Sequence, residues 1–119
     1  NNHLIRKITS SGVVSTLAGS DGASGSANGT GTNATFNFPT GVAVDSSGNV
    51  YVADDSNHLI RKITSSGTVS TLAGTAGTYG NANGTGTGAT FDIPFGVAVD
   101  SAGDVYVADY SNHLIRKII

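Results

Sequence analysis

The chain repeats itself with a period of 55 residues. Residues 58–112 restate residues 3–57 with 42 of 55 positions identical, and a third copy covers only residues 113–119. A repeat of this length indicates one supersecondary unit that buries its faces by stacking on copies of itself. A residue that recurs in every copy is therefore better explained by building the unit than by forming a unique site.

The composition favours strands and turns over helices. The 119 residues include 17 glycines, many Ser, Thr, Asn and Val residues, and no cysteine; this is a poor composition for helices. The lack of cysteine excludes disulfides and thiolate metal sites. The net charge of −2 gives no overall attraction to nucleic acid. No apolar run approaches about 18 residues, so membrane insertion is not expected.

One repeat predicts four strands joined by three tight turns. The turns are rich in Asp, Asn, Ser and Gly, which bond their own backbone or accept positive φ. Three successive hairpins make a four-stranded antiparallel meander. The expected strands of the complete repeat are 41–45, 49–54, 58–64 and 69–73.

The predicted strands are apolar on both faces. In Val50-Tyr51-Val52-Ala53 every residue is apolar or aromatic, whereas a half-solvated sheet would alternate apolar and polar residues. The sheet is therefore expected to lie between two others. A four-stranded sheet that is repeated radially is a β-propeller blade.

A long segment rich in Gly, Ser, Thr, Asn and Ala connects successive units. The two copies differ most in this connector, yet each ends in bulky residues that include Phe36 or Phe91. We predict a surface loop whose end is pinned by a buried Phe. The expected division is a partial blade at 1–19, a connector at 20–40, a full blade at 41–74, a connector at 75–95 and a partial blade at 96–119.

Three motifs carry a family resemblance. Asn-His-Leu-Ile-Arg-Lys-Ile occurs at 2–8, 57–63 and 112–118, Gly-Val-Ala-Val-Asp at 41–45 and 96–100, and Val-Tyr-Val-Ala-Asp at 50–54 and 105–109. These motifs resemble NHL repeats, named for Asn-His-Leu, over essentially the whole chain. The resemblance implies four-stranded blades, usually in a six-bladed propeller, with roles in protein or nucleic-acid interaction and occasionally in catalysis. The long connector is similar to that of large extracellular bacterial NHL proteins, which implies an extracellular or cell-surface location.

The recurring histidines and aspartates favour structural roles. His3 and its two copies follow a turn in each unit, so a ring would hold them far apart, and no metal site is expected. The Asp-x-x-Gly-Asn/Asp turns resemble part of a calcium loop, but the chain has no glutamate for a bidentate ligand. The residues assigned to turns are Asp45, Asp54, Asn57, His58, Asp100, Asp109, Asn112 and His113.

A few positions break the repeat or fit a modification pattern. Tyr79, Phe95 and Tyr110 replace Ser24, Thr40 and Asp55 of the first copy. These aromatic residues are candidates for a specific contact, with simple drift between copies as the alternative. Asn28, Asn33 and Asn83 fit the N-glycosylation sequon in the exposed connectors, a pattern that is also frequent by chance in Asn- and Thr-rich sequence.

The sequence predicts no enzyme and no cofactor. It contains no nucleophile elbow, no triad and no Walker motif, and Gly29-Thr-Gly31 is not followed by a helical pattern. Arg61 and Lys62 are adjacent on a strand and point to opposite faces, so they form no basic patch for RNA. A fragment of a propeller lyase or hydrolase is the least favoured interpretation.

The strand count predicts that the blades are incomplete. With strands A to D numbered outward from the ring centre, the chain runs C-D, A-B-C-D, A-B-C. We therefore expect an all-β fold of about two blades that associates head-to-tail with copies of itself. Such contacts close into a ring or grow into a helical filament, and one third strand, 2–8 or 112–118, is left over. The alternative is a propeller segment that binds a glycan or a protein through its connectors.

Overall fold

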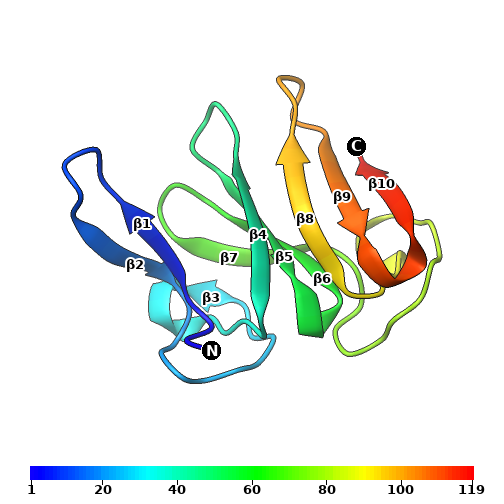
Figure 1. The fold of residues 1–119 in the computed structure, drawn as a ribbon, viewed down its shortest axis with the longest axis horizontal. Coiled ribbons are helices and arrows are strands. Elements are labelled where there is room, and N and C mark those ends of the chain that lie inside the picture. The colour runs from blue at the N-terminus through cyan, green and yellow to red at the C-terminus, as the bar shows by residue number, and fades with distance from the viewer.

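A computed structural model describes all residues, 1–119, and contains three antiparallel sheets that follow one another along the molecule (Figure 1). The first sheet, the half blade, pairs β1 (Ile5–Ile8) with β2 (Val14–Ala18). The second, the complete blade, contains β4 (Pro39–Val44), β5 (Val50–Asp54), β6 (Leu59–Ile63) and β7 (Thr68–Ala73). The third, the three-stranded blade, contains β8 (Pro94–Val99), β9 (Val105–Asp109) and β10 (Leu114–Ile118).

Short elements complete the structure. The short strand β3 (Gly29–Thr30) pairs with β7 at the outer edge of the complete blade. The 3-10 helices are η1 (Gly31–Asn33), η2 (Asp55–Asn57), η3 (Gly86–Gly88) and η4 (Tyr110–Asn112). No helix is long and apolar enough to cross a membrane.

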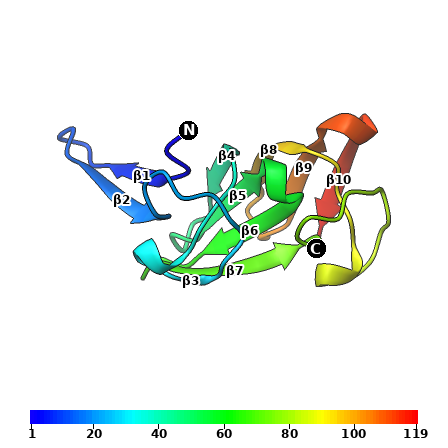
Figure 2. The same ribbon diagram turned by 90° about the horizontal axis from the view of Figure 1, so that it is seen from below.

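The order of strands confirms the predicted blades. The complete blade is the meander β4-β5-β6-β7, and the flanking sheets supply two and three strands of the same pattern. Figure 2 shows, from below, the half blade and the three-stranded blade on opposite sides of the complete blade. The chain therefore forms part of a propeller, with about two blades and an open ring.

The strand bounds differ from the expected ones at the inner strands. β4 and β8 begin at Pro39 and Pro94, two residues before the predicted Gly41 and Gly96. The register shifts between Pro39 and Gly41, so the proline occupies the first strand position, where its lack of an N–H is tolerated. The short β3 was not predicted, because a Gly-Thr pair has no strand pattern of its own.

The core lies between the blades, not within one. One cluster of buried residues includes Tyr51, Ile60, Phe91 and Val107, and joins the complete blade to the three-stranded blade. The other includes Ile5, Phe36, Val52 and Ile63, and joins the complete blade to the half blade. The middle strands β5 and β6 are thus buried on both faces, as their two-sided apolar pattern predicts.

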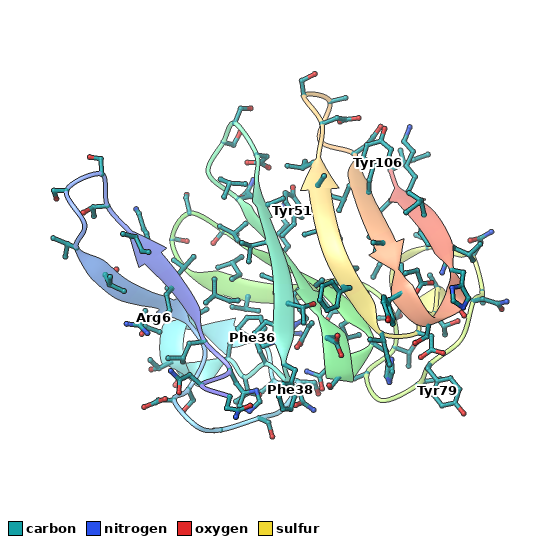
Figure 3. The ribbon with its side chains drawn as sticks, viewed as in Figure 1. Arg6, Phe36, Phe38, Tyr51, Tyr79 and Tyr106 are labelled. Atoms are coloured by element: carbon teal, nitrogen blue, oxygen red, sulfur yellow. The ribbon has the colours of Figure 1, made fainter.

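The connectors are pinned as expected. Phe36 and Phe91 are 0% and 1% exposed, although the Gly- and Ser-rich residues before them lie largely at the surface. Figure 3 places Phe36 beside β4, on the side of the half blade. Each connector therefore carries one large apolar side chain into the boundary between two blades.

The inner strands of neighbouring blades approach very closely. A Cβ at Gly41 would lie 2.7 Å from the carbonyl oxygen of Phe95 and 3.0 Å from the Cα of Gly96. The hydroxyl of Thr40 donates to the same Phe95 oxygen at 2.7 Å. Since only glycine fits at this distance, Gly41 sets the spacing between β4 and β8.

Candidate interaction site

Arg61 of the complete blade is fully buried in a polar pocket. Its Nη1 donates to Asp54 Oδ2 at 2.7 Å and to the Thr35 carbonyl at 2.9 Å. Its Nη2 donates to the Ala27 carbonyl and to Asn28 Oδ1, both at 2.9 Å. These contacts join the third strand to the second strand and to the connector that precedes the blade.

The guanidinium of Arg61 also stacks on an aromatic ring. Its central carbon lies 4.8 Å from the centre of the Phe36 ring, a cation–π contact in a site without solvent. Its Nε has no hydrogen-bond partner. A planar group with several donors is suited to bridge a carboxylate and carbonyls at once, which a lysine could not do.

Asp54 is held by donors from three directions. Besides Arg61, it accepts the backbone N–H of Asn37 at 2.8 Å and the side-chain amide of Asn57 at 2.7 Å. Burial raises the pKa of the Asp54 carboxyl, while these donors act to lower it. The sequence places Asp54 and Asn57 in a turn; the structure adds that both close the pocket around Arg61.

The three-stranded blade repeats the pocket around Arg116. This side chain donates to Asp109 at 2.8 Å, to the Thr90 carbonyl at 3.0 Å and to Ala82 and Asn83 at 2.9 Å. Its guanidinium lies 4.9 Å from the centre of the Phe91 ring. The pocket is therefore a property of the repeat, not of one blade.

Arg6, the third copy of this arginine, has none of these partners. It is exposed and forms no ion pair or side-chain hydrogen bond. It lines a cavity of about 630 Å³ between the half blade and β4, together with Leu4, Ile5, Val42 and Val44. Figure 3 shows Arg6 on β1, at the side of the molecule away from the three-stranded blade.

A second cavity lies at the opposite end of the molecule. It measures about 310 Å³, and its lining includes Gly84, Thr85, Phe91, Arg116 and Ile118. It borders the outer edge of the three-stranded blade. In the complete blade this edge is covered by β7, which pairs Val69 and Thr68 with Gly29 and Thr30 of the connector.

Two of the three histidines connect one blade to the next. His3 Nδ1 accepts the backbone N–H of Phe38 at 3.0 Å, and His58 Nδ1 accepts that of Ile93 at 3.2 Å. All three histidines adopt positive φ, between 55° and 59°, so the residue after the turn is held in a left-handed conformation. The histidines lie one per blade, and no group of three metal-ligating side chains occurs.

The Asp45 carboxylate caps a hairpin turn. It accepts the backbone N–H groups of Ser47 and Asn49 at 3.0 and 2.9 Å, and the side chains of Asn49 and Tyr51 at 3.0 Å. The Asn49 side chain is the largest cause of the lowered pKa of Asp45, and burial raises the pKa of Tyr51. Hydrogen-bond donors thus engage both oxygens, whereas a calcium loop surrounds its ion with oxygen ligands.

The equivalent turn at Asp100 keeps two backbone donors and the hydroxyl of Tyr106, but residue 104 is an aspartate and supplies no side-chain donor. The backbone N–H of Asp104 is the largest cause of the lowered pKa of Asp100. On the neighbouring strand β10, the Lys117 Nζ lies 3.3 Å from Asp104 Oδ2. The hydrogen bond to the Asp104 carboxylate is the largest cause of the raised pKa of Lys117.

The structure brings together two of the three aromatic residues that break the repeat. The rings of Phe95 and Tyr110 lie 5.9 Å apart, with 51% and 65% of each residue exposed. Tyr79 packs instead beside His58, at 5.8 Å, and is 70% exposed. Figure 3 shows Tyr79 projecting away from the fold on the connector.

The sequon asparagines fall into two groups. The side-chain oxygens of Asn28 and Asn83 each accept a hydrogen bond from the arginine of their blade. Asn33 lies in η1 and is exposed. Whether any of the three is modified stays a prediction.

The arginine pocket is the feature that sequence reasoning missed. The signal was present, because an Asp and an Arg recur seven residues apart on neighbouring strands in both copies, at 54 and 61 and at 109 and 116. Two strands joined by a tight turn bring such positions together. The acceptors from the connector carry no comparable signal, since they are largely backbone carbonyls.

The fold and the stacked sheets define a segment of a β-propeller. The family model of the NHL repeat matches residues 36–63 and 91–118, which contain the first three strands of the complete blade and all three strands of the three-stranded blade. The chain belongs to the NHL-repeat β-propeller family, as its motifs indicate.

Two curated relatives align with most of the chain. Human NHL repeat-containing protein 2 is 38% identical over 95 residues, which cover 77% of this chain and 13% of that protein. Protein SUPPRESSOR OF QUENCHING 1, chloroplastic, from Arabidopsis thaliana is 38% identical over 95 residues, covering 79% of this chain and 9% of that protein. The chain thus spans only a small part of these relatives.

Two solved structures from Bacteroides thetaiotaomicron align along nearly the whole chain. A structural genomics protein of unknown function has a TM-score of 0.90 and 32% identity, covering 98% of this chain and 30% of that one. An auxiliary nutrient binding protein has a TM-score of 0.85 and 26% identity, covering 100% of this chain and 33% of that one.

Proposed function

We propose that this chain is a non-enzymatic structural and interaction module that associates head-to-tail with copies of itself. The observation that carries the proposal is the complementarity of its two ends. The half blade offers third and fourth strands, and the three-stranded blade offers first and second strands. Each end borders a cavity, of about 630 and 310 Å³.

Exposed apolar residues beside the half blade also support head-to-tail association. Val42 and Val44 on β4 are 57% and 60% exposed. Their copies Val97 and Val99 pack against the core between the complete and three-stranded blades. A neighbouring inner strand would cover Val42 and Val44 in the same way, at a gain of roughly 25 cal/mol per Å² of apolar surface.

Head-to-tail contacts are heterologous, so their geometry decides the product. Successive copies close into a ring if their rotation adds up to a full turn, and otherwise grow into a helical filament. Light scattering coupled to gel filtration, followed by electron microscopy, tests the proposal. We expect a mass that is a multiple of 11.9 kDa and rings or filaments in the images; a well-folded monomer at all concentrations would refute it.

A second candidate function is binding of a glycan or a protein. Its support is the exposed pair Phe95 and Tyr110 and the nutrient-binding neighbour at 26% identity. Aromatic faces stack well on the apolar faces of sugar rings. We propose neither a nucleic-acid partner for this chain nor its insertion into a membrane.

Variants that restore the first copy's residues test this candidate. Phe95→Thr with Tyr110→Asp removes the pair, and Tyr79→Ser removes the separate aromatic ring. In a glycan array, we expect the double variant to lose a signal that Tyr79→Ser retains. Equal binding by the double variant and the wild type would remove Phe95 and Tyr110 from the site.

We also propose an extracellular or cell-surface location. The nutrient-binding neighbour supports it, and so do the connectors, which are similar to those of extracellular NHL proteins. Fractionation of the source cells with an antibody against the chain tests the location. Recovery in the cytoplasmic fraction alone would contradict it.

A further inference from the structure

We propose that the association works by strand exchange: β1 of one copy replaces β10 of a second copy, and Arg6 enters the pocket that Arg116 occupies. In the assembled blade, Arg6 then pairs with Asp109 of the second copy. This inference rests on the proposed head-to-tail association and specifies its register.

The two strands are interchangeable in sequence. Residues 2–8 and 112–118 are both Asn-His-Leu-Ile-Arg-Lys-Ile. Every partner of Arg116, namely Asp109, Thr90, Ala82 and Asn83, belongs to the chain before β10. These partners would therefore receive Arg6 with the same geometry, and the buried Asp109 would again be paired after the exchange.

β10 buries less apolar surface than β6, its counterpart in the complete blade. Leu114 and Ile115 are 43% and 77% exposed, whereas the same residues of the complete blade, Leu59 and Ile60, are 1% and 0% exposed. Releasing β10 from its blade therefore removes little apolar surface from the core. The contacts that the exchange must break at β10 are then mainly its pairing with β9 and the polar contacts of Arg116, and β1 and Arg6 would restore both kinds.

β1 does not arrive alone, because it is paired with β2. By the register of β7 against β3, β2 would place Val14 beside Gly84 and Val13 beside Thr85. Both valines are now exposed, at 47% and 62%. The hairpin thus fills the 310 Å³ cavity, which β10 by itself leaves open.

The same exchange fills the cavity at the other end. In the completed blade, β8 and β9 of the second copy are the first and second strands, and β1 and β2 of the first copy are the third and fourth. They occupy the 630 Å³ space beside Arg6, Val42 and Val44. One docking event therefore completes one blade and covers one open end on each of the two copies, which makes a second copy the best-fitting occupant.

A disulfide that locks β10 in place tests the exchange. Tyr106 and Lys117 are direct partners across β9 and β10, and the chain contains no cysteine, so Tyr106→Cys with Lys117→Cys gives one defined bond. We expect the oxidised double variant to stay monomeric in sedimentation velocity and to associate after reduction. Each single-cysteine variant, kept reduced, is the control for the loss of the native side chains.

An arginine variant tests the ion pair. Arg6→Gln removes a side chain that has no partner within its own chain, and Lys62→Gln removes one charge from the complete blade as the control. Breaking a buried pair by removing one partner costs enough to weaken association about 100-fold or more. We expect this weakening for Arg6→Gln and unchanged association for Lys62→Gln.

The outcomes separate this inference from the proposed function. A wild-type chain that stays monomeric would refute head-to-tail association itself. A wild type that associates, together with a locked variant and an Arg6→Gln variant that associate equally well, would refute the exchange alone. In that case β2 of one copy would add to an undisplaced β10.

Discussion

Arg61 and Arg6 occupy the same position in two copies of one sequence, yet their surroundings are opposite. Arg61 is fully buried and bonded to a carboxylate, two carbonyls and an amide oxygen. Arg6 is exposed and lines an open cavity. The difference shows that this repeat does not contain its own environment: each third strand depends on the inner strands and connector that cover it.

Two glycines show the same contrast at the ring centre. A Cβ on Gly41 would collide with the backbone of β8, whereas a Cβ on Gly96 would meet only Ala108 at 3.9 Å. The Cβ position of Gly41 faces the neighbouring blade, whereas that of Gly96 faces away from it. The environment of a repeat position is therefore set by the neighbouring blade that it faces.

The largest expected effect comes from emptying the pocket around Arg61. Asp54→Ala leaves a buried guanidinium without its carboxylate, which we expect to destabilise the chain by about 3–5 kcal/mol. Urea denaturation at one fixed protein concentration measures the loss, with Asp21→Ala, an exposed aspartate, as the control. Equal midpoints for the two variants would show that the pocket contributes little to stability.

The two glycines give the next largest effect. Gly41→Ala forces β4 and β8 apart and should cost about 1–3 kcal/mol, while Gly96→Ala should leave the isolated chain nearly unchanged. If copies associate, Gly96 takes the place that Gly41 now has, and Gly96→Ala should weaken association selectively. Denaturation and sedimentation measure the two effects; a Gly96→Ala variant that associates normally would argue against packing of β8 on a second copy.

A smaller effect is expected at the hydrogen bond between inner strands. Thr40→Val removes the donor to the Phe95 carbonyl and should cost about 1 kcal/mol. Thr16→Val, on the exposed β2, serves as the control. A denaturation midpoint for Thr40→Val that matches the control would assign the spacing of β4 and β8 to Gly41 alone.

The smallest effect concerns acid pH. Asp45 and Asp100 have pKa values below the ordinary 3.8, chiefly because of hydrogen bonds from Asn49 and Asp104. Their stabilising contribution is fully present above that value and is lost as the pH falls through the lower folded pKa. Asp45→Asn with Asp100→Asn should therefore flatten the fall in the urea midpoint below about pH 4; an unchanged slope would assign acid sensitivity to other carboxylates.

The fold could be predicted from local patterns because each blade is built from short hairpins. The turn residues around Asp45 and the two-sided apolarity of Val50–Ala53 fix strands and stacking with little long-range information. The pocket of Arg61 could not be predicted in full, because its carbonyl acceptors come from residues 26 and 34 positions earlier in the chain. Backbone acceptors leave no mark in the sequence that identifies them.

The sequence indicates the candidate contact residues only as aromatic positions that break the repeat. Tyr79, Phe95 and Tyr110 stand out because they break the repeat, but nothing in the sequence indicates that Phe95 meets Tyr110 and that Tyr79 meets His58. Their contacts depend on how the connector folds back on the blade. Their role in binding stays a prediction.

The most direct test of blade completion is a cross-link between two different copies. Lys7 of one chain should face Tyr106 of another, since Lys62 faces Tyr51 and Lys117 faces Tyr106 within the chain. A mixture of Lys7→Cys and Tyr106→Cys chains is oxidised and analysed by mass spectrometry, with Tyr51→Cys in place of Tyr106→Cys as the control. Blade completion by strand exchange predicts a mixed dimer in excess of random pairing for Tyr106→Cys and not for Tyr51→Cys. Random pairing in both mixtures would contradict it.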